Sequence, residues 1–390
     1  MISYEEALEI TRKYKPDNDT EYIPFIDSQG RFLAADIISD IDMPPFDKTA
    51  VDGYACRKKD LDLELMINEV IPAGVSAQKP VGEGECVKIM TGAAIPEGAD
   101  WVFMVEDAQE SDGRVKFVGK PGKDNIAKKG EDILKGDTVL RSGKRIDARD
   151  IAVMATVGAV EVPVRKQPRI GIISTGNELV EPHQEPGDSQ IRNSNAYQLI
   201  AQTINAGAIA CYYGIAPDSE ETIFEMVQKA ISECDIVLLT GGVSMGDFDK
   251  VPDVLKRAGV EIMFDRVAVQ PGKPTTFGVH KDALVFGLPG NPVSSYIQFE
   301  LFVKTMIHRS MNAEDNYAIR HHKLASDYRR RRTERMAWVP VHLNSDETVS
   351  PVEYHGSAHI NALPGAYGIM KIPVGISEIR KGEEVDVRQI

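Results

Sequence analysis

The feature that most constrains the fold is an alternation of short apolar runs with amphipathic segments between residues 170 and 309. The apolar runs have the length of strands, and the segments between them carry apolar residues at helical spacing. Strand–helix units repeated in this way predict a doubly wound parallel sheet with helices on both faces. The predicted strands are 170–174, 209–213, 236–239 and 283–286, and the predicted helices are 196–205, 218–233, 251–257 and 292–309.

The N-terminal part of the chain has a different pattern. Ser3 and Glu6 form a capping box, which predicts a short helix that ends before Pro16. From about residue 22 to residue 140, turn residues separate brief β-type runs, which indicates a β-rich region. The predicted strands there include 32–38, 86–90, 101–105 and 114–118.

A domain boundary is expected near residue 167. Asp147 and Asp150 cap a second predicted helix at 148–157, and the 160–168 segment, with two prolines, indicates a linker. At the other end of the α/β segment, short β runs return from about residue 315 and predict a small C-terminal β domain. This domain contains the basic run 329–332.

Composition and charge exclude several classes of protein. The formal net charge of −14 has the wrong sign for a general nucleic-acid binder. No apolar run approaches the ~18 residues of a membrane span, and acidic residues near the N-terminus argue against a secretory signal, so we expect a cytoplasmic protein. The four cysteines have no short spacing that would indicate zinc or disulfides, and we expect them to be packing residues: Cys56, Cys86, Cys211 and Cys234.

Three predicted strands are followed by glycine-containing loops. These loops contain Thr175 and Gly176, Gly241 and Gly242, and the 287–292 segment. In open parallel sheets the ligand crevice lies beyond the carboxyl ends of the strands, where glycines let backbone N–H groups approach phosphate. The three loops together predict a phosphorylated ligand, although each alone is also explained by a tight turn. The chain lacks the glycine motifs of dinucleotide dehydrogenases and P-loop kinases.

Charged residues crowd the same loops. Glu178 follows the first, Asp218 stands at a predicted helix start, and Asp249 follows the second. Such carboxylates together with substrate phosphates suit Mg²⁺, although Asp218 is equally explained as an N-cap and Glu178 as a solvated loop residue. Lys273, between Pro271 and Pro274, indicates either anion capture or a surface turn.

The polar, proline-rich segment 44–55 is unlike an ordinary strand. It indicates an ordered functional loop, although its Asp52-Gly53 pair is also a plain turn signal.

Seven ordered motifs, spread over essentially the whole chain, resemble the MoeA family of molybdopterin molybdenumtransferases, which is related to the gephyrin E domain. They are Asp52-Gly53-Tyr54-Ala55; Met90-Thr91-Gly92-Ala93 with Pro96-Glu97-Gly98; Gly130-Glu131-Asp132; Ser174-Thr175-Gly176-Asn177-Glu178-Leu179; Gly241-Gly242-Val243-Ser244-Met245-Gly246; Pro271-Gly272-Lys273-Pro274; and Leu288-Pro289-Gly290-Asn291-Pro292-Val293-Ser294.

The resemblance implies an enzyme of molybdenum cofactor biosynthesis that inserts molybdate into adenylylated molybdopterin with Mg²⁺-dependent release of AMP. It implies an elongated homodimer with four domains, the third similar to molybdopterin adenylyltransferase. The expected domains are 1–43 with 135–166 (split helical/β), 44–134 (inserted, β-rich), 167–312 (α/β) and 313–390 (β). The implied protein partners are molybdopterin adenylyltransferase and molybdoenzyme-side acceptors; neither nucleic acid nor a membrane is expected.

The resemblance also implies roles for individual residues. The catalytic set is Asp52, Thr91, Asp132, Glu178 and Asp249, and the Mg²⁺ ligands are drawn from Glu178, Asp218 and Asp249. The substrate-binding set is Thr175, Gly241, Gly242, Ser244, Arg266, Lys273, Pro289, Asn291, Pro292, Ser294, Arg335 and Ser357, in which Lys273, Arg335 and Ser357 hold molybdate. In this family the Asp52 loop looks across the two-fold axis into the crevice of the second copy.

Two positions depart from the usual family pattern. Arg266 and Gln270 fall where many members have lysines, and neutral Gln270 loses that charge. Two other classes of function stay open: a stand-alone adenylyltransferase, which would not need the Asp52 loop or the C-terminal domain, and a non-catalytic scaffold, which would be expected to have lost site carboxylates. The choice between molybdate and tungstate, and the acceptor of the cofactor, are also left open.

Overall fold

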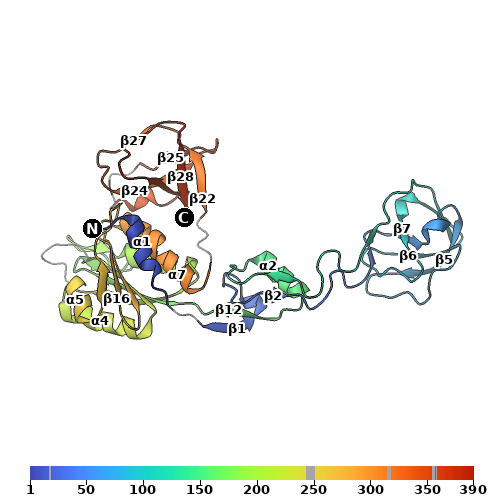
Figure 1. Cartoon of the computed structure of the whole chain (residues 1–390), viewed down its shortest axis with the longest axis horizontal. Coiled ribbons are helices and arrows are strands. Elements are labelled where there is room, and N and C mark those ends of the chain that lie inside the picture. The colour runs from blue at the N-terminus through green and yellow to red at the C-terminus, as the bar shows by residue number, and fades with distance from the viewer. Residues whose placement is uncertain (17–18, 243–250, 314–317, 354–355, 357) are drawn as a thin grey trace.

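A computed structural model describes residues 1–16, 19–242, 251–313, 318–353, 356 and 358–390. The chain is extended along one axis (Figure 1). The α/β region and the C-terminal β region lie together at one end, a small region lies in the middle, and the inserted β-rich region lies at the opposite end.

The α/β region is built on a six-stranded sheet. Its order is β16 (Ile209–Ala216), β13 (Arg169–Thr175), β17 (Ile236–Thr240), β21 (Leu284–Leu288), β20 (Thr276–Val279) and β18 (Glu261–Phe264). The four predicted strands are mutually parallel, as expected, and two further strands that the sequence analysis did not predict, β20 and β18, are antiparallel to their neighbours, so the sheet is mixed. The short connection from β18 to β20 has no crossover helix, which a parallel pairing would need.

Helices cover both faces of this sheet because alternate strand residues point to opposite sides. Ile172, Leu238 and Phe286 pack on one face, and Ile173 and Val285 on the other. The helices are α3 (Ser194–Asn205), α4 (Glu220–Glu233), α5 (Val251–Arg257), α6 (Pro292–Gln298) and α7 (Lys304–Ser310), with the π-helical turn η4 (Phe299–Val303) between the last two. Asp218 was predicted to cap α4, but the structure places Ser219 at the N-cap position.

The first helix, α1 (Tyr4–Arg12), begins with the predicted capping box of Ser3 and Glu6. Its Ala7 is fully buried in the core of the α/β region, and Ile2 forms a bridge with Val267. Helix α1 therefore packs with the α/β region (Figure 1), although the sequence-based boundaries group residues 1–43 with the middle region.

The middle region combines α2 (Ala148–Thr156) with two short strand pairs. The pairs are β1 (Thr20–Pro24) with β12 (Glu161–Arg165) and β2 (Ile37–Ile38) with β11 (Thr138–Leu140). The predicted linker at 160–168 thus contains a strand, which tolerates Pro163 because a two-stranded ribbon has edges where no N–H donor is needed. The predicted strand 32–38 shrinks to β2, because Phe32 and Leu33 make only isolated bridges.

The inserted region, called the distal domain below, has its own six-stranded sheet and two apolar clusters. Its strand order is β7 (Trp101–Met104), β4 (Gly53–Cys56), β6 (Glu85–Ile89), β5 (Glu64–Ile71), β9 (Arg114–Phe117) and β8 (Ala108–Ser111). The predicted strands 86–90, 101–105 and 114–118 are confirmed to within one residue at each end. A further pair, β3 (Lys48–Thr49) with β10 (Ile126–Ala127), connects it to the middle region.

The C-terminal domain is also a β-sheet, and one of its strands comes from the α/β segment. The order is β19 (Val269–Gln270), β24 (Met336–Leu343), β26 (Gly368–Ile372), β28 (Glu384–Gln389) and β22 (Ile319–Lys323), with β25 (Val349–Pro351) beside β24. Strand β19 pairs in parallel with β24, so the segment between β18 and β20 crosses into the C-terminal domain.

The remaining elements are short. They are the strand pairs β14 (Leu179–Val180) with β15 (Ile191–Arg192) and β23 (Tyr328–Arg329) with β27 (Glu378–Ile379), and the 3₁₀ turns Phe25–Asp27, Lys58–Asp60, Val105–Asp107 and Ile360–Ala362. All four cysteines are free thiols and three are buried, as expected of packing residues. In the part of the chain that the structure describes, no helix combines the length and the apolar character that crossing a membrane would require.

Candidate functional site

A cavity of about 290 Å³ lies beyond the carboxyl ends of the parallel strands. Strands β13 and β17 end at its wall in Thr175 and Thr240, and the loop after β21 closes one side. Its lining includes Thr175, Glu178, Asn193, Asn195, Thr240, Gly241, Gly290, Asn291 and Pro292. We call this the strand-end cavity. It lies where the sequence predicted a phosphate crevice, because parallel strands end at one edge of the sheet.

Gly241 and Gly242 are required by the close approach of their loop to β13. Both have positive φ angles, +93° and +60°. A Cβ at Gly241 would collide with the carbonyl of Thr175, and one at Gly242 would lie 2.9 Å from Thr175 Oγ1. Thr175 is 2% exposed, and its buried hydroxyl makes no hydrogen bond to any described residue. Gly241 and Gly242 therefore pack closely against Thr175, and the absence of side chains at these two positions leaves room for a ligand in the cavity.

The two predicted metal-binding carboxylates that the structure describes belong to neighbouring loops. The Glu178 carboxylate folds back over Gly176 and lines the strand-end cavity. The backbone N–H of Asn177 donates to Asp218 Oδ2 at 3.2 Å, and Asp218 N–H donates to Asn177 Oδ1 at 3.1 Å. These reciprocal bonds explain why Asp218 does not cap α4. They also hold a half-buried carboxylate beside the loop that carries Glu178.

An all-oxygen donor set of this kind fits Mg²⁺, which takes one or two carboxylates together with water and phosphate oxygens. Among the described residues, no group of three or more His, Cys, Asp or Glu side chains could hold a metal ion. Asp249, the third predicted ligand, lies outside the described residues, as do Ser244 and Ser357.

A second cavity, of about 340 Å³, lies between the α/β region and the C-terminal domain. It is lined by Gln270, Pro271, Gly272, Lys273, Pro274, Pro289, Asn291, Ser294, Arg335 and Gly356. The β19–β24 pairing brings Lys273, just after β19, beside Arg335, just before β24. We call this the cationic cavity because it contains the side chains of a lysine and an arginine.

Arg335 is held in place by backbone contacts. Its Nη1 donates to the carbonyl of Val269 at 3.1 Å, and its own carbonyl accepts from Arg330 Nη1 at 2.8 Å. Burial lowers the pKa of Arg335, and the positive charge of Arg332 adds to that effect. A partly desolvated guanidinium is suited to an incoming anion.

Asn291 lines both cavities, so they share one wall. The predicted substrate-binding residues divide between the two. Thr175, Gly241 and Pro292 line the strand-end cavity, whereas Lys273, Pro289, Ser294 and Arg335 line the cationic cavity. Gly242 lies against Thr175 behind the first cavity. Arg266 is not among the described residues that line either; its carbonyl accepts a hydrogen bond from the N–H of Ile2.

Two asparagines of this site were missed by the sequence analysis. Asn193 and Asn195, at the start of α3, both line the strand-end cavity and are at most 9% exposed. The sequence did contain a signal for them. Asn193 and Asn195 stand on either side of the first residue of α3, and this helix follows a strand that ends in a glycine-containing loop. Helix-capping chemistry alone accounts for only one of them, because Asn193 is the N-cap.

Three predicted catalytic residues lie away from both cavities. Asp52 Oδ1 accepts two 2.6 Å hydrogen bonds from Thr91, one from the hydroxyl and one from the backbone N–H. These bonds lower the pKa of Asp52. Asp132 lies where the distal domain joins the middle region, and its N–H donates to the carbonyl of Met43 at 3.0 Å. Figure 1 shows the strands that flank Asp52 at the opposite end of the molecule from the α/β region.

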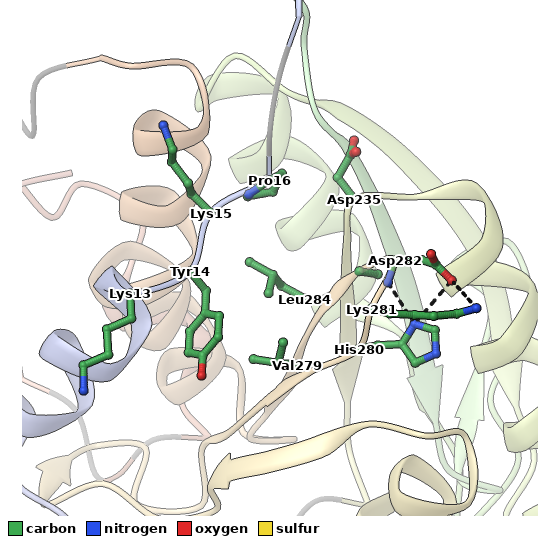
Figure 2. Close-up of a pocket in the computed structure, with 11 residues that line it drawn as sticks. Lys13, Tyr14, Lys15, Pro16, Asp235, Val279, His280, Lys281, Asp282 and Leu284 are labelled. Atoms are coloured by element: carbon green, nitrogen blue, oxygen red, sulfur yellow. Dashed lines mark hydrogen bonds and ion pairs between the residues drawn. The ribbon is translucent and has the colours of Figure 1, made fainter.

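A third cavity, of about 530 Å³, lies at the other edge of the central sheet, where β17 and β21 begin. Figure 2 shows that the side chains of Lys13 and Lys15 extend away from its apolar centre. Two of the lysines that line this cavity already have polar partners. Lys15 Nζ donates a hydrogen bond to Asn312 Oδ1 at 3.2 Å, and Lys281 Nζ lies 3.7 Å from Asp282 Oδ2. None of the predicted site residues lines this cavity. Its greater volume does not make it the functional site.

Comparison with known families accounts for nearly the whole chain. Residues 2–158 match the MoeA N-terminal region (domain I and II), residues 171–309 match a probable molybdopterin binding domain, and residues 321–390 match the MoeA C-terminal region (domain IV). The central match covers the sheet whose strand ends form the first cavity. Fold and site thus define a multidomain protein built around a domain of the molybdopterin-binding class.

Full-length relatives make the assignment more specific. The chain is 37% identical over 99% of its length to the molybdopterin molybdenumtransferase of Bacillus subtilis, covering 93% of that protein, and 35% identical over 99% to that of Staphylococcus epidermidis, covering 95%. The MoeA crystal structure from Pyrococcus horikoshii OT3 superposes with a TM-score of 0.87 at 31% identity, with each chain covered completely. The chain belongs to the MoeA family.

Proposed function

We propose that this chain is a molybdopterin molybdenumtransferase, which inserts molybdate into adenylylated molybdopterin and releases AMP. The observation that carries the proposal is the pair of adjoining cavities that share Asn291. One lies at the strand ends beside a glycine loop, and the other presents a lysine and an arginine. A reaction that joins an oxyanion to a phosphorylated organic ligand needs two such sites side by side.

The strand-end cavity is suited to the adenylylated pterin. Backbone packing at Gly241 and Gly242 allows N–H groups to approach a phosphate without intervening side chains. The buried hydroxyl of Thr175 and the amide of Asn291 provide polar contacts at the wall. In this arrangement the chain binds and orients the phosphoanhydride, and no side chain is required as a nucleophile.

The cationic cavity is suited to molybdate. A tetrahedral dianion calls for positive charge and hydroxyl donors in a partly desolvated site, and Lys273, Arg335 and Ser294 supply these. The net charge of the chain is −14, so the two cations act against the overall field, and a local cluster is what such a ligand requires.

Glu178 and Asp218, together with Asp249 from the sequence prediction, are the residues that would hold Mg²⁺. When bound there, the ion would neutralise charge on the adenylyl phosphate and favour cleavage to AMP. The residues themselves would contribute placement: Asn177 holds Asp218, and the fold of the loop over Gly176 holds Glu178.

A second copy of the chain would complete the site. Asp52 and Thr91 belong to the distal domain, which lies at the opposite end of the molecule from the α/β region (Figure 1), so we do not expect them to reach the two cavities within one molecule. We propose a homodimer in which the Asp52 loop of one chain enters the crevice of the other. A molybdopterin adenylyltransferase would supply the substrate, and molybdoenzyme-side acceptors would take the product.

The test uses purified protein, adenylylated molybdopterin and Mg²⁺, with AMP release followed as molybdate is titrated, and a parallel titration with tungstate. The proposal predicts that AMP release requires the oxyanion and is lost when Mg²⁺ is chelated. ATP-dependent adenylylation of molybdopterin without molybdate would instead identify an adenylyltransferase. Absence of any turnover with substrate bound would identify a scaffold.

A further inference from the structure

Asn195 links the end of strand β17 to the loop that follows strand β21. It lies in the first turn of α3 and is 9% exposed. Its Nδ2 donates to Thr240 Oγ1 at 2.9 Å and to the carbonyl of Gly290 at 2.8 Å. One amide group therefore fastens the last residue of β17 to the loop after β21.

Among the described residues, the other hydrogen bonds between these two segments beyond the β17–β21 ladder are long. Gly241 N–H donates to the carbonyl of Leu288 at 3.4 Å, and Thr240 Oγ1 donates to the carbonyl of Pro289 at 3.5 Å; both distances are at the limit for a hydrogen bond. The loops nevertheless lie in contact, since a Cβ at Gly290 would be 3.7 Å from the Cα of Gly241. The β17–β21 ladder runs as far as Thr240 and Leu288, and beyond that ladder the two bonds of Asn195 are the shorter ones between the described residues.

The orientation of the Asn195 amide follows from its partners. The carbonyl of Gly290 can only accept, so the group that faces it must be the NH₂. Asn195 Oδ1 is buried and has no hydrogen-bond partner among the described residues. A carboxylate at this position would have the same shape but would place an acceptor against a carbonyl. Asn195→Asp thus removes the link with little change of volume.

The two segments that Asn195 links lead directly into residues that line the cavities. Gly241 lies one residue after Thr240 and lines the strand-end cavity, whereas Asn291, one residue after Gly290, lines both. We infer that Asn195 is a positioning residue that fixes the strand-end cavity relative to the cationic cavity, so that the bound oxyanion meets the bound pterin. This inference rests on the proposed function, since it assigns the link a role in joining two substrates.

Asn193 shows that the role belongs to Asn195 specifically. It occupies the same turn but holds other strands: Ser174 Oγ donates to its Oδ1 at 3.1 Å, and its Nδ2 donates to Tyr212 Oη at 2.9 Å. Asn193 also caps α3 through the N–H of Ala196. Asn193 therefore joins β13 and β16. Asn195 instead joins the end of β17 to the loop after β21, between which the substrates would lie.

The test compares Asn195→Asp with Asn344→Asp. Asn344 Nδ2 also makes two side-chain hydrogen bonds, both of 2.9 Å, to Thr348 and Ser350, but in a C-terminal hairpin that lines neither cavity. Each variant is measured for melting temperature, hydrogen exchange of the 236–242 and 287–292 segments, binding of AMP and of molybdate separately, and kcat for AMP release. A purely structural role would lower the melting temperature of both variants and leave kcat intact.

We expect Asn195→Asp to accelerate exchange in both segments and to lower kcat at least about tenfold, while each separate ligand binds within about threefold of wild type. Asn344→Asp should change only the melting temperature. Unchanged exchange in the two segments would overturn the link. A loss confined to AMP binding, with kcat preserved, would overturn the positioning role in favour of direct ligand contact. Failure of the proposed function is recognised separately, as a wild-type protein that binds the probes but releases no AMP.

Discussion

The distal domain and the α/β region both carry predicted site residues, but they assemble them in different ways. In the distal domain, exposed Asp52 and Thr91 contact each other directly through two short hydrogen bonds. In the α/β region, the residues come from strand ends, from the start of α3 and from the C-terminal domain. The distal pair forms a local hydrogen-bonded unit, whereas among the described residues Glu178 is the carboxylate that lines the two cavities. The distal domain therefore carries the Asp52–Thr91 pair, and the α/β region carries the two cavities.

The strongest test of this comparison is whether the two regions act in one site across a dimer. Asp52→Ala and Glu178→Ala homodimers should each lose nearly all molybdate-dependent AMP release. When the two variants exchange subunits, half of the dimers are mixed and each has one intact site of two, so recovery should approach about one quarter of wild type.

Subunit exchange is verified independently by mixing differently tagged chains. Should exchanged mixtures stay inactive, Asp52 and Glu178 of the same chain share a site, and the division of roles between the two regions fails.

A large effect is also expected from Glu178→Gln, which keeps the side-chain volume and removes the charge. We expect a loss of about a hundredfold in kcat, the scale of a lost metal or transition-state contact, together with a higher Mg²⁺ requirement. Glu220→Gln, at an exposed position in the first turn of α4, is the matched control. Normal turnover and normal Mg²⁺ dependence in Glu178→Gln would remove this carboxylate from the site.

Lys273→Ala sharpens the distinction between the two cavities. A charge-assisted hydrogen bond contributes enough that KM for molybdate should rise roughly tenfold or more, while affinity for the adenylylated pterin changes little. Lys281→Ala removes the same charge at the opposite edge of the sheet and serves as the control. If pterin affinity falls and the molybdate dependence stays the same, Lys273 belongs with the phosphate and the assignment of the cavities is reversed.

The smallest effect is expected in the distal domain. Thr91→Val removes the hydroxyl that is the largest cause of the lowered pKa of Asp52. Because these hydrogen bonds favour the ionised carboxylate, the pKa should rise toward its ordinary value, and the stabilisation they give should be present at neutral pH and lost as the pH falls through the folded-state pKa. Carboxyl NMR titration of Asp52 measures the shift; an unchanged pKa would show that the side-chain bond contributes nothing in solution.

Much of the α/β region was predictable because local signals agree with the fold there. Apolar runs of strand length and helical periodicity gave the four parallel strands and their helices with errors of a few residues at the ends. The glycine loops were also found, since close backbone approach leaves glycine as the residue without a colliding Cβ. The failures there include β18 and β20, and β12 in the middle region was also missed; these strands are short and contain or adjoin residues that usually break strands.

The sequence by itself determined which segments become strands and helices, where the glycine turns fall and which family the chain resembles, because these depend on periodicity, capping and backbone sterics over a few residues. Only the tertiary structure decided which residues meet. Lys273 and Arg335 share a cavity because β19 leaves the α/β region to pair with β24, and Asn195 reaches Thr240 and Gly290 because the start of α3 lies at the cavity beyond the strand ends. Helix α3 itself packs on β13, β16 and α6, so these contacts come from its first turn. Such contacts join residues 45 to 95 positions apart, and they depend on sheet order and interdomain pairing that no local pattern encodes.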